Sequence, residues 1–175
     1  MPFPYYQRLN SRQKRIYRKS DSIGEVELPD AQGLRAEVER LHAALEAEDR
    51  RAVERSSAVL ARGICSRLGV PTIAVRVLAA RPSGSWGELH GLYEPEPEPP
   101  LVTLWMRTAA KRRVVAFKSF LRTLVHELLH HLDYELFRFE ETFHTEGFFR
   151  RESSHARQLL GETRPEGGEV RARGD

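Results

Sequence analysis

The sequence predicts an α+β fold. Apolar residues recur every three or four positions across residues 34–68 and 114–137, which is the spacing of amphipathic helices. Short segments rich in β-branched residues separate these two regions and predict strands. These strand segments cover residues 72–79, 86–93 and 101–106. The predicted elements come in the order helices, strands and helices again, and this order favours an α+β fold.

The first helical region holds two successive apolar runs, which predict two helices. The runs are Leu34, Val38, Leu41 and Leu45, then Val53, Leu60, Ile64 and Leu68. Gly69 and Pro71 then end the helical pattern, because glycine is favoured just after a helix and proline cannot continue one. The proline- and acid-rich segment at 94–100 predicts an extended loop. A last helix is expected from about residue 144 to residue 160.

These boundaries predict three regions: a basic N-terminal arm at 1–30, one domain at 31–161 and a tail at 162–175. In the arm, Asn10 or Ser11 is expected to cap a short helix that runs to Tyr17, and the rest is expected to be loosely structured. The tail has very few apolar residues and is expected to be disordered.

Composition is that of a globular protein, with 40% hydrophobic and 30% charged residues. No apolar stretch is long enough to predict a membrane span, and the N-terminus shows no secretory signal. Cys65 is the only cysteine, which excludes an internal disulfide. We therefore expect a cytoplasmic protein with no membrane partner.

Residues 126–130, HELLH, match the H-E-x-x-H pattern of zinc-dependent hydrolases. Positions four apart lie on one face of a helix, so His126 and His130 can present two imidazoles to one ion. Glu127 lies about 100° further round, where it can reach a water at the ion without binding the ion itself. The sequence therefore predicts one zinc ion per chain, with Glu127 as the catalytic base of peptide hydrolysis.

Other residues of this region have two interpretations each. Asp133 falls on the histidine side of the helix, either as a carboxylate that orients an imidazole or as an ordinary solvated residue. His131 is expected to be a hydrogen-bonded neighbour, Tyr134 a packing residue and His155 a surface or loop residue.

The H-E-x-x-H pattern does not identify the third protein ligand of the zinc ion. Catalytic zinc usually has three protein ligands, and His144 follows fourteen residues after His130. The rival candidates are Glu140, Glu141 and Glu146, because a glutamate from a later helix is the other common third ligand.

The stretch HELLHH, the fourteen-residue step from His130 to His144, and Phe148 four residues later resemble the SprT-like metallopeptidases, whose eukaryotic relative is Spartan. The resemblance covers roughly residues 60–155. It implies a minimal zincin-like fold, a small twisted sheet packed on helices, with His144 as the third zinc ligand. The sequence differs in having Thr145 where the family commonly has glycine, and it lacks the cysteine-rich zinc ribbon of many members.

The resemblance implies a zinc metalloendopeptidase with protein or peptide substrates. Family members are linked to cleavage of protein crosslinked to DNA, so nonspecific DNA contact is expected through basic residues 8–19 and 111–113. However, a net charge of only +3 favours an ordinary solvated arm. Residues 101–106 are expected to form the edge strand that aligns a substrate. The alternatives are an inactive zinc-binding scaffold, which the intact Glu127 disfavours, and a nucleic-acid-binding protein whose zinc only braces the fold.

Overall fold

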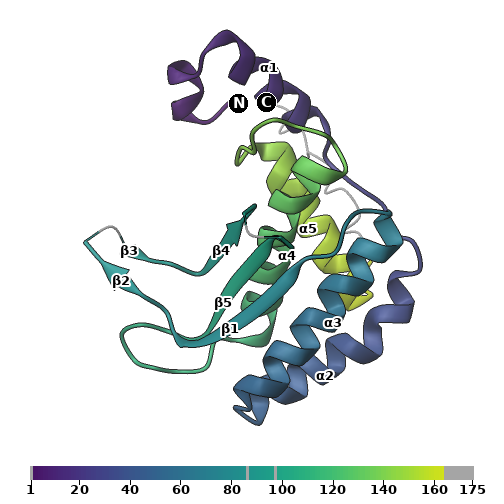
Figure 1. The fold of residues 1–175 in the computed structure, drawn as a ribbon, viewed down its shortest axis with the longest axis vertical. Helices are drawn as coiled ribbons and strands as arrows, with labels where there is room; N and C mark the ends of the chain where they lie inside the picture. The colour runs from purple at the N-terminus through teal and green to yellow at the C-terminus, as the bar shows by residue number, and fades with distance from the viewer. Residues whose placement is uncertain (1, 86, 97, 164–175) are drawn as a thin grey trace, which may run out of the picture.

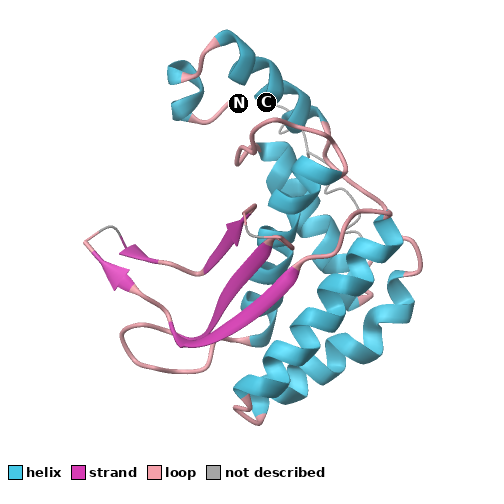
Figure 2. Cartoon of the chain, viewed as in Figure 1, coloured by secondary structure: helices cyan, strands magenta, loops and turns pink. Residues whose placement is uncertain are grey.

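The structure, a computed structural model, describes residues 2–85, 87–96 and 98–163 and has an α+β fold, as predicted (Figures 1 and 2). Its α-helices are α1 Ser11–Ser22, α2 Arg35–Glu46, α3 Arg50–Leu68, α4 Phe117–Glu135 and α5 Glu146–Leu160. The short 3-10 helices are η1 Pro4–Arg8 and η2 Ala31–Leu34. The strands are β1 Ala74–Ala80, β2 Ser83–Gly84, β3 Gly87–Glu88, β4 Gly91–Glu94 and β5 Leu101–Arg107.

The main sheet has the strand order β1-β5-β4, with β1 parallel and β4 antiparallel to β5. β2 and β3 form a separate two-stranded hairpin. The prediction that residues 101–106 form an edge strand is therefore wrong, because β5 is the central strand of the sheet. Its run LVTLWM is apolar at nearly every position and buried from residue 102 to residue 106, which is typical of a strand covered on both faces.

The two edges of this sheet differ. On β1, the backbone N–H of Val77 donates to the Glu54 carboxylate at 2.8 Å, and the Val77 carbonyl accepts from the Arg50 guanidinium at 2.7 Å. These two α3 side chains occupy hydrogen-bonding groups that an added strand would need. β4 forms the opposite edge and lines a cleft of about 590 Å³.

The hydrophobic core lies between the sheet and helices α2 to α5, which gather on one side of it in Figure 1. α4 crosses the middle of this core and contacts β4, β5 and α5. Its fully buried aliphatic side chains are Leu121, Leu124, Val125, Leu128, Leu129 and Leu132. Burial of this apolar face fixes the rotation of α4 about its own axis. That rotation sets the direction in which His126 and His130 point.

The N-terminal arm is more ordered than predicted. α1 continues past Tyr17 to Ser22, and it begins with a reciprocal capping box between Asn10 and Gln13. Tyr17 is 1% exposed, and α1 packs against α5 (Figure 1). The predicted disordered tail lies outside the described residues from residue 164 onward, as does Trp86.

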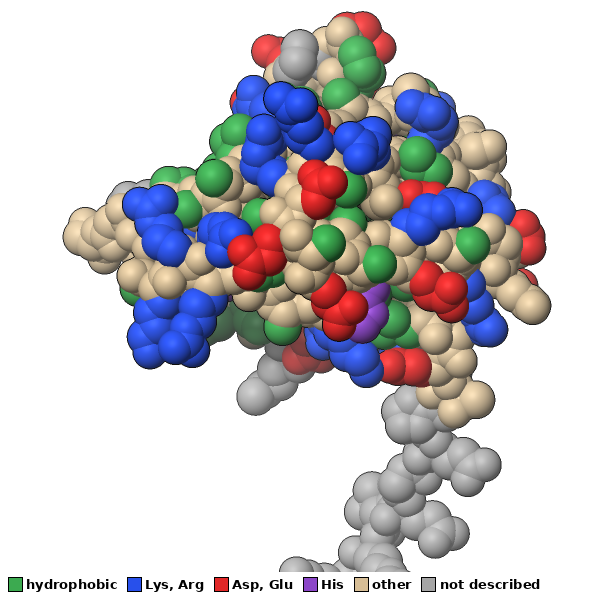
Figure 3. All heavy atoms as spheres, turned by 90° about the horizontal axis from the view of Figure 1, so that it is seen from below, with side chains coloured by type: hydrophobic (Ala, Val, Ile, Leu, Met, Phe, Trp, Pro, Cys, Tyr) green, Lys and Arg blue, Asp and Glu red, His purple; other side chains and the backbone are tan. Residues whose placement is uncertain are grey.

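Charged side chains of both signs cover the surface. On the face shown in Figure 3, Lys and Arg side chains lie in several groups with Asp and Glu side chains among them. Ion pairs such as Arg67–Asp30 and Arg81–Glu88, with N–O distances of 2.8 and 2.9 Å, account for part of the high arginine content. None of the described helices combines the length and apolar character that a membrane crossing requires.

Candidate metal centre

Three histidines from two segments meet beside β4. His126 and His130 lie one turn apart on α4, and His144 lies in the loop just before α5. Nε2 of His144 is 3.0 Å from Nε2 of His126 and 3.1 Å from Nε2 of His130. The structure thus brings together the three residues that the sequence predicted as ligands, close enough to bind one metal ion.

The donor set fits a tetrahedral ion. Imidazole nitrogens at 2.0–2.1 Å from such an ion are separated from one another by roughly 3.3 Å. The two observed Nε2 separations of 3.0 and 3.1 Å are close to that spacing. Three imidazoles, with one position left for another ligand, form a donor set that suits zinc and also copper, iron or nickel.

The ring of Phe148 contacts the rings of all three histidines. Its centroid is 5.0 Å from that of His126, 4.9 Å from that of His130 and 5.2 Å from that of His144. Phe148 is fully buried, and its N–H donates to the side chain of Thr145, the N-cap of α5. Thr145 therefore helps to fix the start of α5 next to the cluster.

His126 is oriented by Glu152 of α5. Its Nδ1 lies 2.9 Å from the Glu152 carboxylate, which also accepts from Arg122 at 2.8 Å. Burial alone would raise the pKa of Glu152, but these hydrogen bonds outweigh burial and lower the pKa. An ionised carboxylate only accepts, which assigns the His126 proton to Nδ1 and leaves the Nε2 lone pair to the cluster. Glu152 was not among the site residues predicted from the sequence, although its spacing of four from Phe148 places both on one face of α5.

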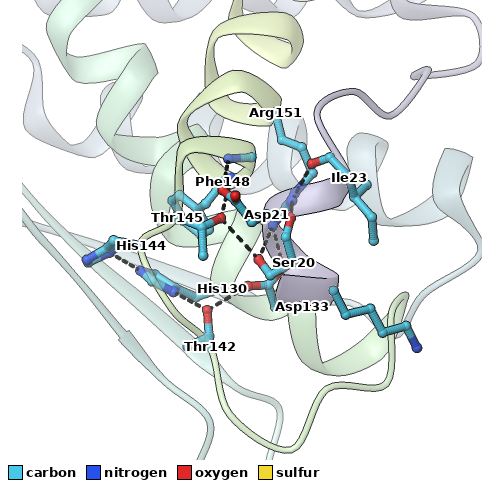
Figure 4. Close-up of polar contacts among 12 residues, drawn as sticks. Ser20, Asp21, Ile23, His130, Asp133, Thr142, His144, Thr145, Phe148 and Arg151 are labelled. Atoms are coloured by element: carbon cyan, nitrogen blue, oxygen red, sulfur yellow. Dashed lines mark hydrogen bonds and ion pairs between the residues drawn. The ribbon is translucent and has the colours of Figure 1, made fainter. Parts of the chain in front are cut away.

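His130 is oriented by a longer chain of contacts (Figure 4). Its Nδ1 lies 2.8 Å from Oγ1 of Thr142, whose hydroxyl donates to the Asp133 carboxylate at 2.7 Å. Because that hydroxyl proton is directed to Asp133, the Thr142 oxygen accepts from His130 Nδ1, and Nε2 again keeps its lone pair. Asp133 is fully buried, so it is not a solvated residue but a carboxylate that orients an imidazole through Thr142.

The protein environment favours the neutral forms of His130 and His144. Burial, together with the neighbouring His126 and His144, lowers the pKa of His130 to about 3. The His144 side chain is the most exposed of the three, yet the surrounding protein and His126 also lower its pKa. Neutral imidazoles offer the lone pairs that metal binding requires.

Glu127 lies between α4 and β4. It is 7% exposed, and burial raises the pKa of its carboxyl to about 7. An added Cβ at Gly91 of β4 would lie 2.5 Å from Oε1 of Glu127 and 2.8 Å from its Cγ. Glycine at position 91 therefore leaves the space in which the Glu127 side chain lies.

The rival third ligands are elsewhere. Glu140 forms an ion pair with Arg12, and Glu141 accepts from Gln13 at 2.9 Å. Glu146 is exposed on the first turn of α5, and none of the three joins the histidine cluster among the described residues.

Two further histidines are buried. His131 has the predicted role of a hydrogen-bonded neighbour, since its ring contacts the Tyr93 hydroxyl at 3.2 Å and the Pro71 carbonyl at 2.8 Å. The expectation that His155 is a surface or loop residue is wrong. It is 1% exposed on α5 and packs against the aliphatic face of α4. Tyr134 stacks on Tyr93, with ring centroids 6.1 Å apart, which supports its predicted packing role.

The cluster opens into a cleft of about 590 Å³ between β4 and α4. β4 forms one wall with Gly91, Leu92 and Tyr93. The opposite wall carries the histidine cluster and Glu127. The cleft therefore joins the histidine cluster, a buried carboxylate and the β4 edge of the sheet.

Comparison with protein families, with curated proteins and with solved structures finds no match to this chain. Its function must therefore be inferred from the site itself.

The contact between Gly91 and Glu127 provides one test of the site. Gly91→Ala is expected to displace the Glu127 side chain and to lower any hydrolytic kcat by about 10- to 100-fold, because small misplacements of a reacting group are costly. Metal affinity should not change, since Gly91 contacts none of the three imidazoles. Steady-state kinetics and metal titration on the same samples would measure both quantities.

Leu78→Ala is the matched control, because Leu78 lies on β1 outside the cleft and is 38% exposed. Equal kcat for Gly91→Ala and the parent would show that Glu127 tolerates displacement and is not the reacting carboxylate.

Proposed function

We propose that this protein is a zinc-dependent metalloendopeptidase with a minimal zincin-like fold. One observation carries the proposal: three imidazole Nε2 atoms converge in a cleft that also holds a buried carboxylate one residue from the first of them. A site that only braced the fold would have no use for Glu127 in the cleft. Zinc is the proposed metal because catalytic zinc sites combine three protein ligands with one open position.

The ion would be held by His126, His130 and His144. When bound, zinc supplies Lewis acidity, which polarises a carbonyl oxygen and lowers the pKa of water. Glu127 accepts a proton from the attacking water at a carboxylate oxygen and then delivers it to the nitrogen of the leaving amine. Burial favours the protonated form of this carboxyl, and a bound cation would favour the ionised form that accepts the proton.

Substrate is proposed to lie along β4. Side chains of α3 occupy hydrogen-bonding groups on the β1 edge, so β4 is the edge we propose for pairing with an extended peptide, which would compete with the Glu127 carboxylate for the backbone of Tyr93. β4 borders the same cleft as Glu127, so a paired peptide would pass in front of the histidine cluster.

Metal removal and replacement test this proposal. Dialysis against a chelator should abolish cleavage of an unstructured protein such as casein, and one equivalent of Zn²⁺ per chain should restore it. Atomic absorption would give the stoichiometry, and gel or mass analysis would show the cleavage.

The outcomes separate the alternatives. Binding of one zinc ion without cleavage of any protein or peptide substrate would favour the inactive scaffold. Zinc whose removal unfolds the protein, together with nucleic-acid binding and no cleavage, would favour the zinc-braced nucleic-acid-binding protein. Cleavage that persists without metal would contradict zinc-dependent chemistry.

A further inference from the structure

The first residues of the chain contact the loop that carries the third histidine. The Tyr5 hydroxyl donates to the backbone carbonyl of His144 at 2.6 Å. The Tyr17 ring lies 6.2 Å from that of Phe143, the residue before His144. Gln13 donates to Glu141 in the same loop at 2.9 Å. η1 and α1 thus hold the backbone of the His144 loop from one side.

A second connection runs from α1 to His130 through buried charge. Arg151 of α5 is fully buried, and its guanidinium donates to Asp133 at 3.0 Å. The same guanidinium donates to the carbonyls of Ser20 and Ile23, at 2.7 and 2.6 Å, and to the Ser20 hydroxyl at 3.1 Å (Figure 4). A buried cation requires such partners, and most of them come from the end of α1.

This network ends at a metal-binding residue. Asp133 accepts from Arg151 with one oxygen and from Thr142 with the other, and Thr142 accepts from His130. Loss of the α1 carbonyls would leave Arg151 with unpaired buried donors, so Arg151 and Asp133 would have to rearrange. The orientation of His130 therefore depends on a segment more than one hundred residues earlier in the chain.

The backbone of α1 lies in close contact with the first turn of α5. An added Cβ at Gly147 would lie 2.4 Å from the carbonyl oxygen of Asp21 and 2.5 Å from that of Ser20. The Gly147 N–H also donates to the Asp21 carboxylate at 3.0 Å. Gly147 lies only three residues after His144, so this contact is next to the ligand loop.

We propose that residues 3–23 form an N-terminal clamp that positions His130 and His144 for metal binding. The inference rests on the proposed metal site and adds a role for a segment outside the cleft. Tyr5 and Ser20 act as positioning residues: Tyr5 holds the His144 backbone, and Ser20 completes the partners of Arg151.

This role differs from that of a free basic arm. Arg12 pairs with Glu140, and the ammonium of Lys19 lies 5.5 Å from the Phe139 ring centroid. Both partners belong to the segment between α4 and α5. These cations of the arm thus face the ligand-bearing part of the protein.

Gly147→Ala in the full chain tests the clamp. The added methyl group meets backbone atoms of Ser20 and Asp21 that cannot turn aside, so α1 should separate from α5. Affinity for Zn²⁺, measured by competition with a chromogenic chelator, is expected to fall by about 10- to 100-fold, as for loss of partners that orient a metal ligand. The visible absorption of Co²⁺ bound in place of zinc should change, because it reports the number and geometry of ligands.

Tyr5→Phe is the second variant, because it removes one hydroxyl and keeps the ring. It should weaken metal binding less than Gly147→Ala but in the same direction. Gly63→Ala and Tyr6→Phe are the matched controls, since an added methyl at Gly63 meets the flexible Leu34 side chain, and the Tyr6 hydroxyl accepts from Arg18. Both controls should bind metal as the parent does.

The outcomes distinguish this inference from the proposed function. A parent that binds metal, with Gly147→Ala and Tyr5→Phe giving the same affinity and the same Co²⁺ spectrum, would overturn the clamp alone. A parent that binds neither Zn²⁺ nor Co²⁺ would overturn the metal site and the clamp together. If Gly147→Ala fails to fold, equal metal binding by Tyr5→Phe and the parent would overturn the assigned role of Tyr5 and with it the clamp as proposed.

Discussion

Glu127→Gln is expected to reduce peptide hydrolysis by about 10²- to 10⁴-fold, which is the usual contribution of a positioned general base. Glutamine has nearly the same shape as glutamate but cannot accept the proton of the attacking water. Zinc stoichiometry and affinity should be retained, because Glu127 is not one of the three clustered residues. Single-turnover cleavage of a labelled peptide, with metal analysis of the same preparation, measures both effects.

Glu135→Gln is a suitable control for this variant. Glu135 lies at the end of the same helix and pairs with Arg138 outside the cleft. Its amide variant should cleave as the parent does. Full activity in Glu127→Gln would mean that another group accepts the proton, or that the site does not perform this chemistry.

Local sequence patterns predicted the helices well. The apolar spacing of α2, α3 and α4 depends on residues three and four apart, so it is visible without knowledge of the fold. The approach of His126 to His130 on one side of α4 follows from the same helical geometry. Strand order is different, because it depends on pairing between distant segments. The position of β5 at the centre of the sheet was therefore missed, although its unbroken apolar run was visible.

The remainder of the site could not be predicted from spacing. Glu152 and Thr142 reach the imidazoles only because α5 folds back along α4 and the intervening loop turns towards His130. Apart from a short helix ending at Tyr17, the arm was expected to be loosely structured because its composition is polar and basic. Its order depends instead on the buried Tyr17 ring and on hydrogen bonds to Arg151, a residue that lies 128 positions after Ile23.

His144→Ala is expected to weaken zinc binding by more than ~100-fold. That factor is the largest loss expected when a residue that only orients a metal ligand is removed. The variant removes one of three nitrogen donors and leaves two imidazoles with an enlarged open position. Glu140→Gln, Glu141→Gln and Glu146→Gln should weaken zinc binding far less than His144→Ala, because those carboxylates lie outside the cluster. Competition with a chelator of known affinity would rank all four variants in one series.

The ranking decides between the two kinds of third ligand. His144→Ala must also be compared with His126→Ala and His130→Ala, since removal of any true ligand should have a similarly large effect. A glutamate variant that loses more affinity than His144→Ala would show that the protein rearranges around the ion and recruits a carboxylate. In that case the resemblance to SprT-like metallopeptidases would lose its main support, because that resemblance depends on the histidine that follows His130 by fourteen residues.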